Sequence, residues 1–547
     1  MQEFAGAVAD GDEFMPGKSF NITGLCFPNE NYMVNIEGRL KEIKKLVAEE
    51  KYFIINRARQ YGKTTTLWAL QQYLQPEFIS VFLSFQKLST TDFSDEYAFT
   101  AAFADIFVQA VRSKNVMGLD AANMAELKKA AEGRDSSTGL RKLFKILGNL
   151  CECSVRPLVL MIDEVDNASN NQVFLDFLAM LRGSYLDRKS LPAFQSVILA
   201  GVYDIKNLKL KIRPEEEHKY NSPWNIAAEF SIDMSFSAYD IAGMLKDYES
   251  DYRTGMNIEK VADCIYEYTS GYPYLVSAIC KLIDERLMRH KDFEENSSSA
   301  WSEAGVKEAV RILLKEPNTL SDDMIKKLAD YPELNLMLKE ILFSGKNFSF
   351  NPYNYAVNMG KMLGFIRESN DSVAVANRIF EMQLYNYFLS EEMTKSITYE
   401  SALQERNQFV ENENLNMDKV MQKFQEHYSE IYSGNDIRFL EENGRRLFLL
   451  YLKPIINGSG NYYVEARTRD MNRTDVVIDY RGRQYIVEMK IHRGEAYERK
   501  GIEQLAGYLT EYKLSKGYLL VFNFNKNKKA GMKTVQCGGK EILEVIV

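Results

Sequence analysis

The sequence predicts an α/β protein in which a parallel sheet is followed by a helical segment and then by a second α/β domain. Three observations predict this class. Short apolar runs alternate with helical apolar spacing over residues 37–236, a pattern typical of a parallel sheet covered by helices on both faces. Residues 237–330 keep the helical spacing without a strand-like run. Two period-2 runs, 476–479 and 484–490, then indicate neighbouring strands.

Length and composition limit the kinds of protein that this chain encodes. Its 547 residues are too many for one core and favour three or more domains. The net charge of −8 argues against unselective coating of nucleic acid, although it allows a local basic patch. No apolar run is long enough to span a membrane, and residues 1–13 are small and acidic, so we expect a cytoplasmic protein with no membrane partner. Six scattered cysteines fit reduced thiols.

The first candidate site is a polar loop between the apolar run 53–55 and a helical pattern over 64–74. The loop ends in Gly62-Lys63-Thr64, so the start of the helix can offer backbone N–H groups to a phosphate. Lys63 can neutralise the outer phosphate oxygens, and the Thr64 hydroxyl can bind Mg²⁺. The usual P-loop spacing GxxxxGK[ST] has glycine where this chain has Arg57. The loop alone is therefore equally compatible with an ordinary helix start.

A second feature favours the nucleotide site. The apolar run 157–162 leads into Asp163-Glu164, so a buried parallel strand carries two acids at its C-terminal end. Asp163 is suited to hold Mg²⁺ through water, and Glu164 is suited to polarise the attacking water. The alternative is a core strand that runs into a solvated acidic turn. Beyond another buried run, 194–201, either Tyr203 or Asp204 could sense the γ-phosphate, although a plain strand-end turn explains them more simply.

The middle of the chain predicts two further segments. Residues 237–330 suit a helical lid on an ATPase core, in which Gly271 and Pro273 separate two helices. A helix over 357–362 and a hairpin over 364–376 form the pattern of a winged helix, which binds duplex DNA or packs domains together, and we favour packing. The strongly polar stretch 400–416 is typical of a linker.

The hairpin near the C-terminus carries a second set of chemically active residues. If Arg481-Gly482 is a two-residue turn, counting back along both strands sets Asp475 opposite Glu488. The period of two puts Lys490 on the same face. Two carboxylates could thus hold Mg²⁺ while Lys490 orients water for cleavage of a phosphodiester. The alternative is a solvent-facing Glu-x-Lys pair on an edge strand.

Residues downstream extend this candidate site. Gln504 and Tyr508 are four positions apart in a predicted helix, so they share a face and could brace the lysine or contact the scissile strand. A group of basic residues fits either a phosphate backbone or a solvated basic face. These residues are Arg467, Arg469, Arg473, Arg483, Arg493, Arg499 and Lys500.

At these two places the sequence resembles the prokaryotic AAA-ATPase-like proteins that carry a C-terminal nuclease domain of the PD-(D/E)xK superfamily. The loop Arg57-Ala-Arg-Gln-Tyr-Gly-Lys-Thr64 is similar to that family's Arg-Pro-Arg-Arg-Phe-Gly-Lys-Ser loop, in which arginine takes the place of the first glycine. Ala58 and Gln60 depart from it, so no role is carried over to residue 60.

In the C-terminal region Asp475, Glu488 and Lys490 match the superfamily's metal-binding and catalytic positions, and Gln504 with Tyr508 matches its Gln-x-x-x-Tyr helix. The superfamily's upstream acid corresponds to Glu441 or Glu442, between which the sequence does not decide. The resemblance implies ATP and Mg²⁺ as cofactors and ATP hydrolysis linked to cleavage of DNA or RNA, in defence against foreign nucleic acid. It does not identify the substrate, and we expect DNA rather than RNA as the nucleic-acid partner.

A signalling or scaffold ATPase whose C-terminal domain binds nucleic acid or protein without cutting is the alternative function. The oligomeric state stays open, a homo-oligomer included. We expect an N-terminal segment (1–36), an ATPase core (37–236), a helical lid (237–330), a winged-helix-like domain (331–400), a linker (401–430) and a nuclease-like domain (431–547). The expected nucleotide-binding residues are Arg57, Arg59, Gly62, Lys63, Thr64, Thr65 and Asp163, and the expected catalytic residues are Glu164, Asp475, Glu488, Lys490 and Gln504.

Overall fold

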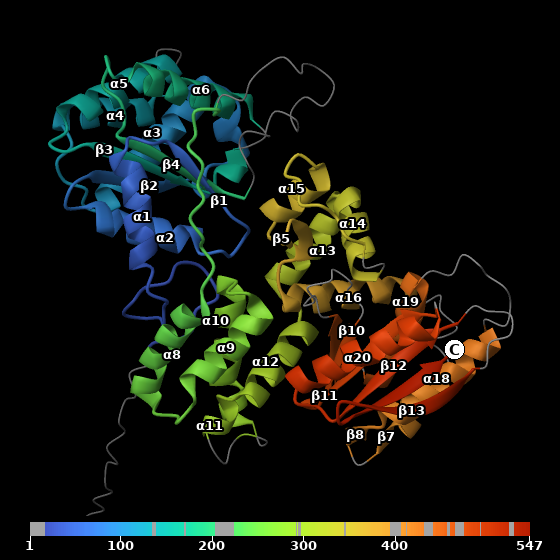
Figure 1. The fold of residues 1–547 in the computed structure, drawn as a ribbon. Coiled ribbons are helices and arrows are strands. Elements are labelled where there is room, and N and C mark those ends of the chain that lie inside the picture. Colours follow the sequence, from blue (N-terminus) through green and yellow to red (C-terminus); the bar gives the residue numbers. More distant parts are fainter. Residues whose placement is uncertain are drawn as a thin grey trace, which may run out of the picture. The chain divides into compact units, whose positions relative to one another are not determined.

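The chain forms two compact units in a computed structural model (Figure 1). One unit comprises Met1–Tyr266 and Gly271–Glu303, and the other comprises Glu267–Ser270 and Ala304–Val547. The structure describes residues 17–133, 138–168, 171–202, 224–290, 293, 297–343, 346–393, 406–411, 413–431, 441–456, 460–464, 475–492, 494–523 and 530–547.

The first unit is built on a parallel sheet. Its strands are β1 (Phe53–Asn56), β2 (Ile79–Ser84), β3 (Leu158–Asp163) and β4 (Ser196–Gly201). They lie in the order β1-β4-β3-β2, and all of the pairings are parallel. Every residue of β3 and β4 is buried, as expected for strands with helices on both sides. The predicted parallel α/β sheet is therefore confirmed.

Helices cover both faces of this sheet (Figure 1). They are α1 (Glu37–Ala48), α2 (Lys63–Leu74), α3 (Glu96–Ser113), α4 (Ala121–Glu132), α5 (Leu140–Cys153) and α6 (Gln172–Asp187). One core packs α3 to α6 against strand residues such as Leu160, and the other packs α1 and α2 against residues such as Met161. Neighbouring strand residues point to opposite faces, which is why Leu160 and Met161 belong to different cores.

The helical segment that follows has the break expected at its glycine. Its helices are α8 (Ala238–Tyr252), α9 (Ile258–Thr269), α10 (Pro273–Glu285) and α11 (Ser297–Ala300). Gly271 has φ +72°, and a Cβ there would lie 1.9 Å from the carbonyl oxygen of Phe236. Pro273 starts α10, where its missing N–H has no cost.

The described N-terminal residues, 17–36, form no helix or named strand and pack by aromatic contacts. The ring of Phe20 lies 5.3 Å from that of Tyr248 and 5.9 Å from that of Trp301. The Tyr32 hydroxyl donates to Asp251 at 2.8 Å. These contacts fix the irregular segment to α8 and to the residue after α11.

The second unit begins with helices and a hairpin. These elements are α12 (Glu303–Lys315), α13 (Thr319–Asp330), α14 (Pro332–Phe343), α15 (Tyr355–Met362), β5 (Ile366–Ser369), β6 (Ser372–Val375) and α16 (Arg378–Met393). The hairpin turns at Asn370 and Asp371, whose φ values are +50° and +60°, as a two-residue turn requires. The helix and hairpin lie where the sequence predicts them, and a winged-helix role stays a prediction.

A mixed sheet follows in the second unit. Its strands are β9 (Gly460–Val464), β10 (Asp475–Tyr480), β11 (Arg483–Ile491), β12 (Lys516–Phe522), β13 (Gly531–Cys537) and β14 (Lys540–Ile546). Their order is β13-β14-β12-β11-β10-β9. The pairs β11–β12 and β12–β14 are parallel, and the other pairs are antiparallel.

Two glycines show which helices cover which face of this sheet. A Cβ on Gly444 of α19 (Glu441–Ile456) would lie 2.6 Å from the Phe522 ring, and one on Gly517 would lie 2.9 Å from Leu509 of α20 (Glu495–Glu511). Residues 517 and 522 differ by an odd number in one strand, so α19 and α20 lie on opposite faces. The Tyr428 ring of α18 (Met417–Ile431) lies 5.5 Å from Phe522, on the α19 side.

Several described elements were not predicted, among them α4, α14, β9, β13 and α18. Residues 410–415 form the short strands β7 (Val410–Glu411) and β8 (Asn414–Leu415), and α18 occupies much of the expected linker 401–430. Its buried Val420, Met421 and Phe424 have helical spacing, which the polar composition of the stretch concealed. All six cysteines are free thiols, as expected. Within the described chain no helix has the length and apolarity needed to cross a membrane.

Candidate functional site

The P-loop runs from β1 to the first residue of α2. Gly62 precedes the helix with φ +74°, a left-handed conformation that glycine adopts without strain. The first intrahelical bond runs from Thr66 N to Gly62 O at 2.9 Å. The earlier N–H groups of α2 therefore remain directed toward the loop, as an anion site requires.

Lys63 is buried and bonded within the loop. Lys63 is only 7% exposed. Its ammonium donates hydrogen bonds to the carbonyl oxygens of Arg57 at 2.8 Å and Ala58 at 2.9 Å. Burial lowers the pKa of Lys63 from its ordinary value. A phosphate bound in the loop would compete with these two carbonyl oxygens for the Lys63 ammonium.

Thr64 and Asp163 come together where α2 begins and β3 ends. The Thr64 hydroxyl donates to the Asp163 carboxylate at 2.6 Å, and the backbone N–H of Glu164 donates to the other carboxylate oxygen at 2.9 Å. Asp163 is 1% exposed, and burial raises its pKa. A buried carboxylate beside a hydroxyl oxygen is a donor set that fits Mg²⁺. The residues at this point therefore fit the cation that the sequence predicts.

Glu164 is half-buried and held in an uncommon conformation. Its φ is +55°, which is rare for a residue other than glycine and typical of constrained functional turns. Burial, followed by the neighbouring Asp163, raises the pKa of Glu164. The structure thus brings Lys63, Thr64, Asp163 and Glu164 to one corner of the sheet.

Asp166 also belongs to this corner, although the sequence analysis did not single it out. Its carboxylate accepts a hydrogen bond from the backbone N–H of Val202 at 2.6 Å, which ties the turn after β3 to the end of β4. The run Asp163-Glu164-Val165-Asp166 contained this signal. Tyr203 and Asp204, the candidate γ-phosphate sensors, lie outside the described residues.

The arginine at the start of the loop is bonded to backbone carbonyls of a distant segment. The Arg57 guanidinium donates to the carbonyl oxygens of Ile232 at 2.7 Å and Phe230 at 3.4 Å, and it lies 5.2 Å from the centre of the Phe230 ring. Sequence reasoning made Arg57 a nucleotide ligand, whereas its described contacts fasten the loop to residues 230–232.

Two other expected ligands also have contacts that the sequence did not indicate. The Arg59 carbonyl oxygen accepts a hydrogen bond from the Tyr272 hydroxyl. The Thr65 hydroxyl oxygen accepts one from the backbone N–H of Cys26 at 3.4 Å. The loop and the start of α2 are thus held by α10's preceding residue and by the N-terminal segment.

The second candidate site lies on β10 and β11. Arg481 and Gly482 have φ values of +49° and +78°, so they form the predicted two-residue turn. The pairing register sets Asp475 opposite Glu488. This confirms the predicted register. The side chain of Asp475, like those of Glu441 and Glu442, lies outside the described part of the structure.

Four expected residues meet on the face of the sheet that α20 covers. The Lys490 ammonium lies 2.6 Å from a Glu488 carboxylate oxygen and donates to the Gln504 amide oxygen at 3.5 Å. The Gln504 amide nitrogen donates to the Tyr508 hydroxyl at 3.2 Å. Glu488 is fully buried and Lys490 is 4% exposed. Lysine, glutamate, glutamine and tyrosine therefore form one continuous polar chain under α20.

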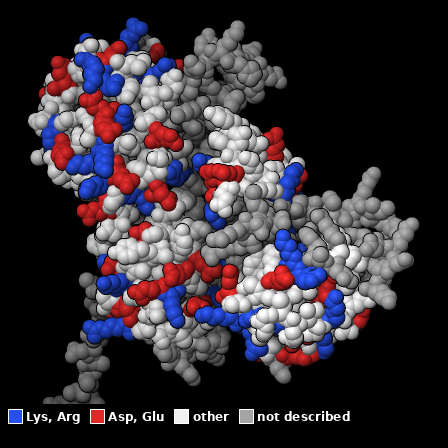
Figure 2. Space-filling view, in the orientation of Figure 1, with Lys and Arg blue, Asp and Glu red and all other residues white. Residues whose placement is uncertain are grey.

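Among the described side chains, no group of three or more His, Cys, Asp or Glu is arranged to hold a metal ion. Of the basic residues, Arg483, Arg499 and Lys500 are exposed, and the others are outside the described residues. Figure 2 shows Lys and Arg interspersed with Asp and Glu on the face that it displays.

Comparison with known proteins identifies the family of the chain. No curated protein sequence matches the chain. The Walker-type ATPase PABY2304 of Pyrococcus abyssi is 14% identical, with a TM-score of 0.46 over 67% of this chain and 99% of that one. The RuvB Holliday junction branch migration motor of Thermotoga maritima is 12% identical, with a TM-score of 0.31 over 62% and 92% of the two chains.

The ORC1 protein of Aeropyrum pernix, solved in complex with DNA, is 12% identical, with a TM-score of 0.28 over 66% of this chain and 94% of its own. These likenesses are too distant to carry an argument about activity. The family profile of the AAA-like domain matches residues 35–391. This match spans more than half of the chain, and the protein therefore belongs to the AAA-like domain family.

Proposed function

We propose that this protein binds and hydrolyses ATP at the P-loop and cleaves phosphodiester bonds of nucleic acid at the C-terminal sheet, with Mg²⁺ at both places. The ATPase half has the stronger support. A single observation carries it: the Thr64 hydroxyl and the Asp163 carboxylate meet at 2.6 Å where a helix begins and a buried strand ends. Membership of the AAA-like domain family agrees with this half.

The residues of the first site divide the work of hydrolysis. The N–H groups at the start of α2 bind the phosphate oxygens. The Lys63 ammonium exchanges its two carbonyl partners for phosphate oxygens. Thr64 and Asp163 would hold Mg²⁺, which when bound offsets the negative charge of the phosphates. Glu164 orients and deprotonates the attacking water, and its raised pKa suits a group that accepts a proton.

ATP turnover by the purified protein tests this half. Wild-type protein should release phosphate from ATP only when Mg²⁺ is present, and Lys63→Ala should lose both binding and turnover. Lys142→Ala replaces an exposed lysine on α5 of the same unit and should leave turnover unchanged. Equal turnover by the wild type and Lys63→Ala would remove the P-loop assignment.

The nuclease half rests on the register of β10 and β11. Asp475 and Glu488 occupy opposite positions in the hairpin, and Lys490 is the next residue on the same face. In the proposed role the two carboxylates hold the metal, which when bound offsets charge on the phosphate under attack. Lys490 orients water, and Gln504 with Tyr508 positions Lys490. DNA is the preferred substrate class, and destruction of foreign nucleic acid is the proposed purpose.

The buried ion pair at the second site favours one alternative. The Lys490 ammonium forms a buried ion pair with a Glu488 carboxylate oxygen at 2.6 Å. A metal ion bound by Glu488 would have to displace this ion pair. A signalling or scaffold ATPase would keep that pair for stability and would use the C-terminal domain only for binding.

A biological assay separates the two functions. If cleavage is the function, the double variant Asp475→Ala, Lys490→Ala should lose the protein's protection of cells against foreign nucleic acid. Under the alternative function, the double variant should keep its activity in cells, whereas Lys63→Ala should lose it. Cleavage of a panel of single- and double-stranded DNA and RNA, with and without ATP, then identifies the substrate and tests whether ATP controls cleavage.

A further inference from the structure

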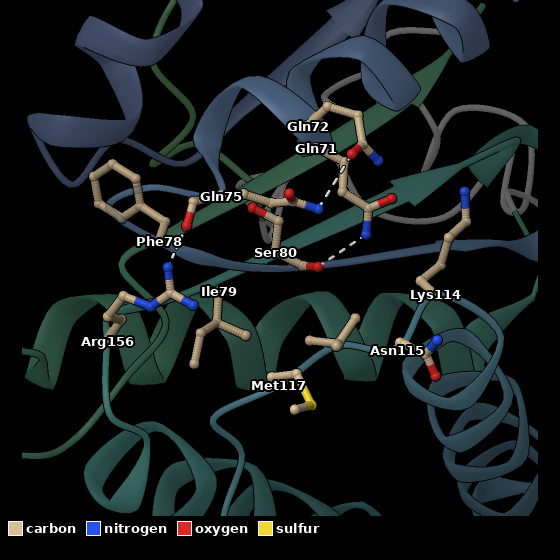
Figure 3. Close-up of a pocket in the computed structure, with 11 residues that line it drawn as sticks. Gln71, Gln72, Gln75, Phe78, Ile79, Ser80, Lys114, Asn115, Met117 and Arg156 are labelled. Atoms are coloured by element: carbon tan, nitrogen blue, oxygen red, sulfur yellow. Dashed lines mark hydrogen bonds between the residues drawn. The ribbon is translucent and has the colours of Figure 1, made fainter.

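A cavity of about 260 Å³ lies at the open edge of the sheet in the first unit. Its walls are the C-terminal half of α2, the start of the edge strand β2, residues 114–117 after α3, and Arg156 (Figure 3). Gln71 is eight positions after Lys63 on α2, which corresponds to about 12 Å along the helix axis. The cavity is therefore separate from the P-loop.

Two buried oxygens in the wall have no hydrogen-bond partner among the residues that the structure describes. Gln71 is 3% exposed and Ser80 is 4% exposed. The amide nitrogen of Gln71 donates to the Ser80 carbonyl oxygen at 2.9 Å, and Figure 3 shows its amide oxygen turned away from Ser80. That Gln71 oxygen and the Ser80 hydroxyl both lack a partner among the described residues. Buried polar atoms are rarely left in this state without water or a ligand.

The cavity is also positively charged. Lys114 and Arg156 both line it, and no acidic residue does. Within the described chain no carboxylate forms an ion pair with Lys114, and burial lowers the pKa of its ammonium. Arg156 donates to the backbone carbonyl of Gln75 and to no carboxylate in the described residues. The described residues thus give the cavity two cations and no acidic side chain.

We infer that this cavity binds a small organic anion that also carries hydroxyl or N–H groups. Lys114 and Arg156 stand at opposite ends of the cavity in Figure 3. The carboxylate or phosphate group of the ligand would lie against Lys114, since charge-assisted hydrogen bonds favour this contact. A hydroxyl or N–H of the ligand would donate to the Gln71 amide oxygen, and the Ser80 hydroxyl can donate to it or accept from it. Ile79 and Met117 provide the apolar part of the wall.

Isothermal titration of the full-length protein with citrate and with glycerol 3-phosphate tests the inference, because each probe combines anionic groups with a hydroxyl. At least one probe should bind, and the stronger one identifies the anionic group as carboxylate or phosphate. Lys114→Gln should weaken binding by about tenfold or more. Gln71→Glu, which keeps the size of the side chain and adds a negative charge, should weaken it further.

Two control variants separate this cavity from the P-loop and from general surface charge. Lys63→Ala should bind the probe as the wild type does, and so should Lys142→Gln on the exposed face of α5. Thermal unfolding of Lys114→Gln and Gln71→Glu checks that both variants fold. The inference is wrong if neither probe binds the wild type. It is equally wrong if folded Lys114→Gln and Gln71→Glu bind as well as the wild type, or if Lys63→Ala abolishes binding.

Discussion

The Thr64 hydroxyl donates a hydrogen bond to the Asp163 carboxylate at 2.6 Å, across 99 positions of the chain. Thr64 stands in the first turn of α2, and Asp163 is the last residue of β3. The hydroxyl and carboxylate oxygens therefore lie together where a helix begins and a strand ends. Such positioning lowers the cost of binding a cation and its nucleotide.

Replacement of Glu164 should separate ATP binding from hydrolysis. Glu164→Gln keeps the size of the side chain but cannot accept the proton of the attacking water. Turnover should fall by about 10²- to 10⁴-fold while ATP affinity stays near that of the wild type. Phosphate release and equilibrium binding of ATP measure the two effects. Glu152→Gln, at an exposed site on α5, is the control, and unchanged turnover in Glu164→Gln would argue against its role.

Introducing the usual P-loop glycine should weaken this protein. Arg57→Gly removes charged hydrogen bonds to the carbonyl oxygens of Phe230 and Ile232. We expect the free energy of unfolding of the first unit to fall by about 2 kcal/mol. Arg57→Lys keeps the positive charge and a hydrogen-bond donor group, so its free energy of unfolding should fall by less than that of Arg57→Gly. Thermal unfolding without nucleotide measures both variants, and a glycine variant as stable as the wild type would contradict the tethering role.

Asp166 should act through the backbone of Val202. Asp166→Ala leaves the Val202 N–H without its acceptor, which should cost about 1 to 3 kcal/mol of unfolding free energy. Asp166→Asn keeps an acceptor oxygen and should stay close to the wild type. Urea unfolding of the two variants measures the difference. A loss of the same size in Asp166→Asn would show that the negative charge, and not the hydrogen bond, is what matters.

Lys453 should make the stability of the second unit depend on pH. Burial lowers the pKa of Lys453 from 10.5 to about 8. Its ammonium contacts the Asn386 amide oxygen and lies 5.7 Å from the centre of the Tyr462 ring. Between these two pKa values the unfolded chain binds more protons than the folded one, so stability rises with pH across this window.

Removal of the amine should therefore stabilise the protein at neutral pH. Lys453→Met should raise the free energy of unfolding by up to about 3 kcal/mol near pH 7. The advantage should shrink as pH rises through the window and the wild-type lysine loses its proton. Urea unfolding at several pH values measures the trend, with exposed Lys419→Met as the control. A difference in unfolding free energy between Lys453→Met and the wild type that does not change with pH would contradict the lowered pKa of Lys453.

The parts of the fold that the sequence predicted are those that local patterns determine. Period-2 apolar runs located β10 and β11, and the Arg481-Gly482 turn set their register to the residue. Likewise, the break between α9 and α10 follows from Gly271 and Pro273. These features depend on neighbouring residues, so one sequence contains them.

The parts that were missed depend on distant partners or on edge positions. Nothing near Arg57 indicates that its guanidinium will bond carbonyls more than 170 positions away. Strand β13 is at the edge of its sheet and has largely polar, exposed residues, so it has no apolar run to mark it. The buried stripe of α18 was hidden within a polar stretch.

Cleavage of DNA by the full-length protein in the presence of Mg²⁺ and ATP, compared with cleavage by Glu488→Gln, tests the two-site account most directly. We expect the wild type to cut DNA and Glu488→Gln not to cut it, while both proteins hydrolyse ATP at the same rate. Equal cutting by both proteins, or no cutting by the wild type across the nucleic-acid panel, would contradict it.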